Sequence, residues 1–272
     1  MESGHSNNFL YRAAERTGRT VIAGIEEAGT CGVLLGQSFY WLFVGPRIRQ
    51  PVRLNHVITQ MVEIGIHAIF IMAIMGATIG VMLAIQGIYA LRLFGAESRV
   101  VIGIALSTVR EFGPLITAIM VAARSGSGLA ARIGTMKINE ELDALNVMGI
   151  NPVRFLVVPA LLAMVVMVPA LTLLSIYVGL YSAGLYVQWE LGMSMMAFSK
   201  DVINILTIDD LLHGLGKSII FAVLIAVIGV VNGASVKGGA EGVGKVTTHA
   251  VVQSIAAIVI TDMVFALVVT QI

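Results

Sequence analysis

Charged residues and cysteine are both scarce in this chain of 272 residues. Asp, Glu, Lys and Arg make up 12% of it, about half of their share in soluble domains. The formal net charge is +1, so the chain offers no strongly basic surface for nucleic acid. The single cysteine, Cys31, excludes an intramolecular disulfide framework and a cysteine-rich metal site. The class that fits these absences is an integral membrane protein.

The sequence also lacks the groupings that an enzyme or a metalloprotein requires. No His or carboxylate pair has metal-ligand spacing, and no Ser–His–Asp arrangement stands out. Residues 239–246, GAEGVGKV, approach the phosphate-binding motif GxxxxGK[ST], but Val246 replaces the magnesium-binding hydroxyl and no strand precedes the motif. We therefore expect a Gly-rich loop over residues 232–249, and neither catalytic residues nor a metal or cofactor in this chain. Residues 1–18 contain no apolar run of signal-peptide type, so we expect no cleaved leader.

Long apolar runs dominate the rest of the chain. Crossing the hydrocarbon core of a bilayer takes about 20 residues, and five runs qualify: residues 65–91, 100–123, 153–181, 215–231 and 250–269. Residues 21–44 are less apolar and include Glu26 and Glu27, and each charge costs about 2.5–3.5 kcal/mol at mid-span. We interpret them as an interfacial elbow helix. The sequence predicts an all-α integral membrane protein with an N-terminal part, residues 1–60, and a transmembrane part, residues 61–272.

Basic residues lie mainly on one side of these spans. That side carries Arg12, Arg16, Arg19, Arg47, Arg49, Arg53, Arg124, Arg132, Lys137, Arg154, Lys237 and Lys245. The other side carries only Arg92, Arg99, Lys200 and Lys217. Because cytoplasmic loops are enriched in Lys and Arg, we predict a cytoplasmic N-terminus, a cytoplasmic central loop (residues 122–159) and an outward C-terminus.

The central loop contains a predicted short helix. Asn139 is its expected N-cap. Glu140 and Glu141 lie in its first turn, where the helix dipole favours negative charge. Gly149 is its expected stop, and Asn151 is expected to cap the next helix. A short helix held between two spans suits contact with another protein. An ordinary amphipathic loop on the membrane surface is the alternative.

Three ionisable residues fall within the spans, where a charge usually faces a protein interior or a wet cavity. Arg110 and Glu111 are adjacent in span two, and Asp262 is about 12 residues into span five. Neighbouring side chains on an α-helix point about 100° apart, so Arg110 and Glu111 need different partners. Asp262 is a candidate partner of Arg110. A structural ion pair and the border of a polar headgroup site both remain open.

One side of span one, at its outer end, carries the residues Leu83, Gln86, Ala90, Leu91 and Phe94. Such a face could line an apolar cavity. Packing between helices and contact with lipid give the same pattern.

Residues 107–159 carry several motifs in order. These are R-E-x-G-P at 110–114, A-R-x-G-S at 123–127, E-x-L-x-A-L at 140–145 and M-G-x-x-P at 148–152. With the Gly-rich segment that ends in Thr247 and Thr248, and with Asp262, they resemble the MlaE/YrbE family of permeases. The resemblance extends from about residue 61 to the C-terminus.

The resemblance implies an interfacial helix and five spans that form a homodimer in the bacterial inner membrane. It implies a coupling helix that contacts a cytoplasmic ABC ATPase, where ATP and Mg would bind; its residues would be Glu140, Glu141, Asp143, Leu145 and Met148. It further implies a periplasmic MCE protein, a possible STAS-domain subunit, and a role in outer-membrane lipid asymmetry. The lipid, a phospholipid in first place, would contact Leu83, Gln86, Leu91, Phe94, Arg110 and Glu111.

Two other functions compete with the lipid permease. An ion-coupled secondary transporter would be expected to show internal repeats and paired broken helices, and the sequence has neither. A membrane scaffold would leave the charges within the spans without a task. Purification with an ATPase partner would distinguish the permease from both alternatives.

Overall fold

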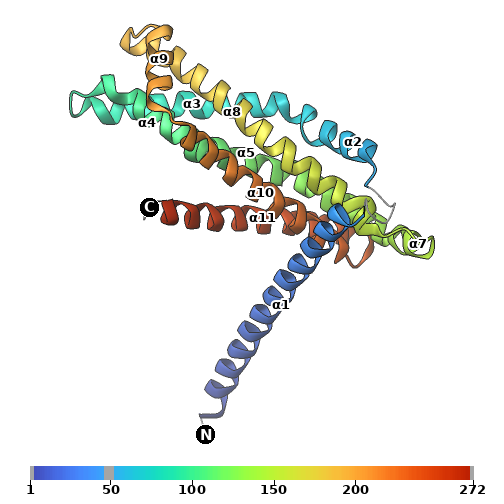
Figure 1. The fold of residues 1–272 in the computed structure, drawn as a ribbon. Coiled ribbons are helices and arrows are strands. Elements are labelled where there is room, and N and C mark those ends of the chain that lie inside the picture. The colour runs from blue at the N-terminus through green and yellow to red at the C-terminus, as the bar shows by residue number, and fades with distance from the viewer. Residues whose placement is uncertain (1–2, 46–51, 270–272) are drawn as a thin grey trace. The chain divides into compact units, whose positions relative to one another are not determined.

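The computed structural model describes residues 3–45 and 52–269 (Figure 1). The chain divides into two compact units, Met1–Pro51 and Val52–Ile272. In the first unit a continuous helix of 41 residues, α1 (Ser3–Phe43), begins well before the predicted elbow. Neither described range contains a strand, so the prediction of an all-α protein is confirmed.

Five helical segments of the second unit are long and apolar enough to cross a membrane, as predicted. They are Leu54–Arg92, Glu97–Ile138, Val153–Leu191, Ile208–Ala234 and Gly239–Val268. Their longest α-helices are α2 (Leu54–Ile64), α3 (Ile69–Arg92), α4 (Val100–Ser107), α5 (Gly113–Val121), α6 (Ser127–Ile138), α8 (Val158–Leu191), α10 (Ile208–Ala234) and α11 (Gly239–Val269). Two short helices, α7 (Glu141–Val147) and α9 (Met195–Ile205), lie at opposite ends of this unit (Figure 1).

Two segments that we predicted as loops are helical. The second span continues through residues 122–138 to Ile138, and α11 begins at Gly239, inside the predicted loop at 232–249. The segment Glu97–Ile138 has 42 residues, which corresponds to about 63 Å of helix and exceeds the ~30 Å hydrocarbon core. The helices therefore extend beyond the membrane, and the near-match to a phosphate-binding motif lies in the first turns of α11.

Small residues on α10 let it pack backbone to backbone against the helical residues 122–138. A Cβ at Gly233 of α10 would lie 2.7 Å from the carbonyl oxygen of Ala130 in α6, and a Cβ at Gly229 would lie 3.0 Å from that of Gly126. The packing gained at such crossings offsets the cost of glycine within a helix, about 1 kcal/mol per residue.

The closest crossing joins α3 to α8. A Cβ at Gly80 would lie 2.0 Å from the carbonyl oxygen of Gly179, and a Cβ at Gly76 would lie 2.7 Å from that of Ser175. Ser182 adds a hydrogen bond by donating its hydroxyl to the carbonyl of Ala77 at 3.1 Å. Nothing larger than hydrogen fits at Gly80 unless the two backbones separate.

We predict that Gly80→Ala destabilises the protein by about 1–3 kcal/mol, because the added methyl overpacks a backbone contact. Thermal unfolding of the detergent-solubilised protein would measure the loss. Gly103→Ala in α4 is the matched control, because a Cβ there meets no atom within 4 Å. Equal melting temperatures for the Gly80 and Gly103 variants would contradict the close crossing.

Candidate functional site

The second span, Glu97–Ile138, is interrupted by a π-helical turn, Thr108–Phe112. The amide of Gly113 donates to the carbonyl of Thr108, five residues back. Pro114 has no amide hydrogen, so it cannot give the carbonyl of Arg110 its usual partner four residues on. The wider turn that results turns the adjacent side chains of Arg110 and Glu111 toward α10.

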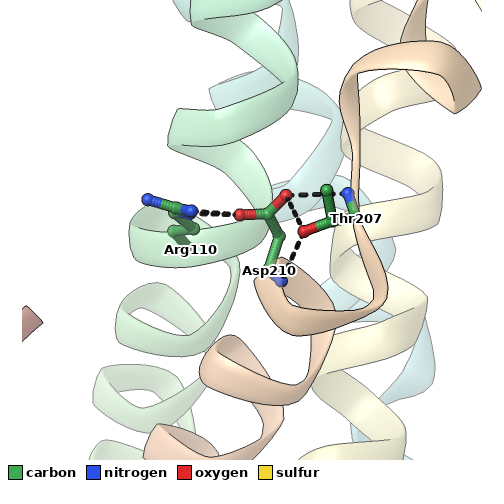
Figure 2. A network of polar contacts seen from close by, with 3 residues as sticks. All are labelled: Arg110, Thr207 and Asp210. Carbon is green, nitrogen blue, oxygen red and sulfur yellow. Dashed lines mark hydrogen bonds and ion pairs between the residues drawn. The ribbon is translucent and has the colours of Figure 1, made fainter. Parts of the chain in front are cut away.

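Arg110 forms an ion pair with Asp210, which lies in the first turn of α10 (Figure 2). The Asp210 side chain is 2% exposed, so its charge needs partners for both oxygens. Oδ1 contacts the Arg110 guanidinium, and Oδ2 accepts hydrogen bonds from the Thr207 amide and hydroxyl, each at 2.8 Å. The Thr207 hydroxyl in turn accepts from the Asp210 amide at 3.3 Å. Asp210 therefore completes the N-terminal cap of α10 and anchors Arg110 at the same time.

Lys217 lies about two turns further along α10 and is fully buried. Its Nζ donates to Oε2 of Glu111 at 2.6 Å. The same Nζ lies 2.9 Å from Oδ1 of Asp262 in α11, an ion pair without hydrogen-bond alignment. One ammonium group thus joins the π-helical turn, α10 and α11.

Gly214 allows this approach. It lies on α10 between Asp210 and Lys217, and a Cβ there would lie 2.3 Å from the carbonyl oxygen of Val109. The backbone of α10 therefore touches the π-helical turn directly. That contact brings both acid–base pairs within bonding distance.

These five residues form what we call the charge cluster: Arg110, Glu111, Asp210, Lys217 and Asp262. It holds two cationic and three acidic side chains, so it carries one excess negative charge if all are ionised. The side chains of Arg110 and Glu111 remain 43% and 40% exposed, whereas those of Asp210 and Lys217 are buried. The cluster therefore presents one cation and one carboxylate at the surface of a membrane-spanning bundle, where a polar headgroup or a second protein chain could meet them.

The predicted pair between Arg110 and Asp262 is wrong. We began span four at residue 215 and assigned Lys217 to the outer side, whereas α10 begins at Ile208 and buries Lys217. The earlier start places Asp210 and Lys217 on one face, between the π-helical turn and α11. Two sequence signals could have revealed them: the capping pattern of Thr207 with Asp210, and the spacing of four and then three residues from Asp210 through Gly214 to Lys217.

The predicted lipid-contacting residues of span one lie apart from the cluster's ion pairs. Leu83 and Leu91 are half-buried, and Leu91 packs on the buried core that α3, α4, α8 and α9 share. Gln86 is exposed, and Phe94, in the turn after α3, is 81% exposed. No polar contact joins Gln86 to the charge cluster in the part of the chain that the structure describes. Their contact with lipid stays a prediction.

The predicted coupling segment is a short helix at the end opposite α9. Asn139 is not its N-cap; Glu140 occupies that position with a left-handed backbone, φ 60°. The stop at Gly149 is confirmed, because its φ is 73° and the amide of Ile150 donates to the carbonyl of Leu145 at 2.9 Å.

The cap of the next helix and the exposure of the α7 side chains complete the description of the predicted coupling segment. The cap by Asn151 is confirmed, since its Oδ1 accepts from the amide of Val153 at 2.9 Å. Leu145 is buried, whereas Glu140, Glu141, Asp143 and Met148 are exposed. The four exposed side chains are therefore available to another protein, and their coupling role stays a prediction.

We predict that Lys217→Met destabilises the protein by about 3–5 kcal/mol, because it leaves two buried or half-buried carboxylates unpaired. Adding Glu111→Gln and Asp262→Asn should restore much of the loss, since those changes remove the unpaired charges. Unfolding of the purified protein in detergent measures both effects. Lys245→Met is the control, because Lys245 is 75% exposed and its one ion pair among the described residues is with Glu241. A triple variant less stable than Lys217→Met would contradict the arrangement.

The chain is similar to known membrane permeases over most of its length. The family model described as "Permease MlaE" matches residues 57–268. A probable ABC transporter permease protein of Synechocystis sp. is 37% identical over 230 residues, 84% of this chain and 85% of that protein. A probable ABC transporter permease protein of Rickettsia felis is 31% identical over 254 residues, 93% of this chain and 96% of that protein.

A third relative is named for its substrate. The intermembrane phospholipid transport system permease protein MlaE of Haemophilus influenzae is 34% identical over 239 residues, 87% of this chain and 89% of that protein. The resemblance inferred from the motifs is thereby confirmed: this multi-pass membrane protein belongs to the MlaE family of permeases.

Proposed function

We propose that this chain is the permease subunit of an ABC-type transporter that moves a phospholipid between the inner membrane and a periplasmic MCE protein. The observation that carries the proposal is the charge cluster, which joins the second, fourth and fifth spans. A charge inside a span is costly and is kept where it meets a protein interior or a polar substrate. Arg110 and Glu111 are both partly exposed, and their opposite charges match the phosphate and the amine of a zwitterionic headgroup.

ATP hydrolysis takes place on a partner subunit in this proposal. Helix α7 contacts the ATPase through its exposed face, Glu140, Glu141, Asp143 and Met148, while buried Leu145 fixes it to its own chain. The second span carries Arg110 and Glu111 and continues to Ile138, which lies two residues before Glu140. Movement of α7 therefore acts on the same helical segment that carries the exposed charges. A STAS-domain subunit would complete the cytoplasmic side.

A second copy of the chain completes the permease. Only 11% of the apolar part of α11 is buried within one chain, against 61% for α10. We place the second copy against α11, so that the lipid lies between the two copies, near spans one and two. In this arrangement Leu83, Gln86, Leu91 and Phe94 contact the acyl chains. The N-terminus lies in the cytoplasm, and the membrane is the bacterial inner membrane.

We predict that Glu140→Lys together with Glu141→Lys releases the ATPase or uncouples its activity. Purification through a tag on this chain should bring down an ATPase with the wild type, and the double variant should lose it or hydrolyse ATP without lipid movement. Asp201→Lys together with Asp209→Lys is the control, because it changes the charge equally at the α9 end, opposite α7. Absence of any ATPase in mild detergent would favour the ion-coupled transporter or the scaffold.

We predict that Glu111→Gln slows lipid movement about tenfold or more without lowering the yield of the complex. Gln keeps the shape, and loss of one carboxylate leaves two cationic and two acidic groups in the cluster, so folding is preserved. Transfer of a fluorescent phospholipid from proteoliposomes measures the rate, with Glu241→Gln as the control. A lower yield of complex with unchanged transfer per complex would assign the cluster a purely structural role.

A further inference from the structure

A cavity of about 150 Å³ with both polar and apolar walls lies between α2 and the start of α6, away from the charge cluster. The residues of its wall that matter here are Gln60, Glu63, Arg124, Ser125, Gly128 and Arg132. Ile64, Leu129 and Met164 add an apolar border. A water molecule needs about 10–15 Å³ of such a cavity, so the space is large enough for a phosphate group with some of its hydration.

The two arginines differ in how their charge is compensated. Arg132 is held by α2: its guanidinium lies 3.3 Å from Oε2 of Glu63 and donates to Oε1 of Gln60 at 3.0 Å. Within residues 52–269, no carboxylate lies within 4 Å of the Arg124 guanidinium. Two arginines and one glutamate give the cavity a net charge of +1, and Arg124 supplies the charge that is not balanced.

The depth of the cavity fits a lipid headgroup. Arg124 follows Glu97, the start of the second span, by 27 residues, or about 40 Å of helix at 1.5 Å per residue. The hydrocarbon core is ~30 Å thick, and the bilayer with its headgroups is ~40–45 Å thick. Arg124 therefore lies at headgroup level on the α7 side, and Arg132, two turns further along, lies beyond it. Gly128, between them on the helix, leaves the cavity open.

We propose that this cavity binds the phosphate group of a lipid from the leaflet on the α7 side. The Arg124 guanidinium provides the planar donor pair that matches phosphate oxygens, and the Ser125 hydroxyl provides a further donor. The apolar border made by Ile64 and Met164 receives the glycerol and the first carbons of the acyl chains. Basic pockets between spans on the cytoplasmic side are suited to such headgroups. This site is separate from the charge cluster and does not depend on the proposed transport function.

The test compares two probes that differ only in phosphate: dioctanoyl phosphatidic acid and dioctanoyl glycerol. Binding to the full-length protein in detergent is measured by native mass spectrometry. Wild type should bind phosphatidic acid at least tenfold more tightly than dioctanoyl glycerol. Arg124→Gln should weaken that binding about tenfold, and Glu63→Gln should strengthen it severalfold, because it removes the negative charge beside the site. Arg99→Gln, at the other end of the same span, is the control and should leave binding unchanged.

Further arms separate this site from its alternatives. The effect of Arg124→Gln should persist when Arg110→Gln is also present, since the charge cluster is a different place. Inorganic phosphate that bound as tightly as phosphatidic acid would overturn the assignment to lipid. Equal binding by wild type and Arg124→Gln, or weaker binding by Glu63→Gln, would overturn the site itself. Loss of an ATPase partner from Arg124→Gln with unchanged lipid binding would assign the arginine to a protein contact instead.

Discussion

The burial of Lys217 is the constraint on which the middle of this protein depends. An ammonium group at this depth is tolerated only with partners, and Glu111 at 2.6 Å and Asp262 at 2.9 Å supply them from two different segments. Its position fixes how α10 and α11 lie against the second span. The same geometry brings Asp210 to Arg110, so the two pairs support each other through one stretch of α10. Helices in a membrane gain little from apolar association with one another, which gives such polar contacts greater weight.

Backbone features make these contacts possible. Pro114 removes one donor from the helix, and the π-helical turn before it presents Arg110 and Glu111 side by side. The same pattern recurs at the start of the third span, where the amide of Val158 donates to the carbonyl of Val153 and Pro159 follows. Gly214 then lets α10 touch the first of these turns. A proline and a glycine thus place four charged side chains that the sequence separates by about a hundred residues.

One continuous helical segment links the places on which the proposals rest. The second span carries Arg110 and Glu111 in its π-helical turn, Arg124 beside the cavity and Ile138 at its end, where Glu140 turns the chain into α7. A displacement of α7 therefore reaches both polar sites through a helix, a stiffer connection than a loop. The exposed charges, the cavity beside α2 and the short surface helix are therefore all connected to the second span.

The sequence by itself determined the class, the number of spans and the C-terminal end of the short helix. Apolar runs of sufficient length have no other stable solution than membrane helices, and Gly149 and Asn151 act through their own backbone and nearest neighbours. It also indicated that Arg110 and Glu111 need separate partners, because that follows from helix geometry. The tertiary structure alone decided which partners they have and that residues 122–138 and 239–249 continue as helix. It also decided that Arg132 binds Gln60 and Glu63 beside a cavity that Arg124 lines. Those outcomes depend on close contacts between segments that are distant in the sequence, such as Gly233 with Ala130 and Gly214 with Val109. The local sequence pattern carries no information about which helix surfaces meet.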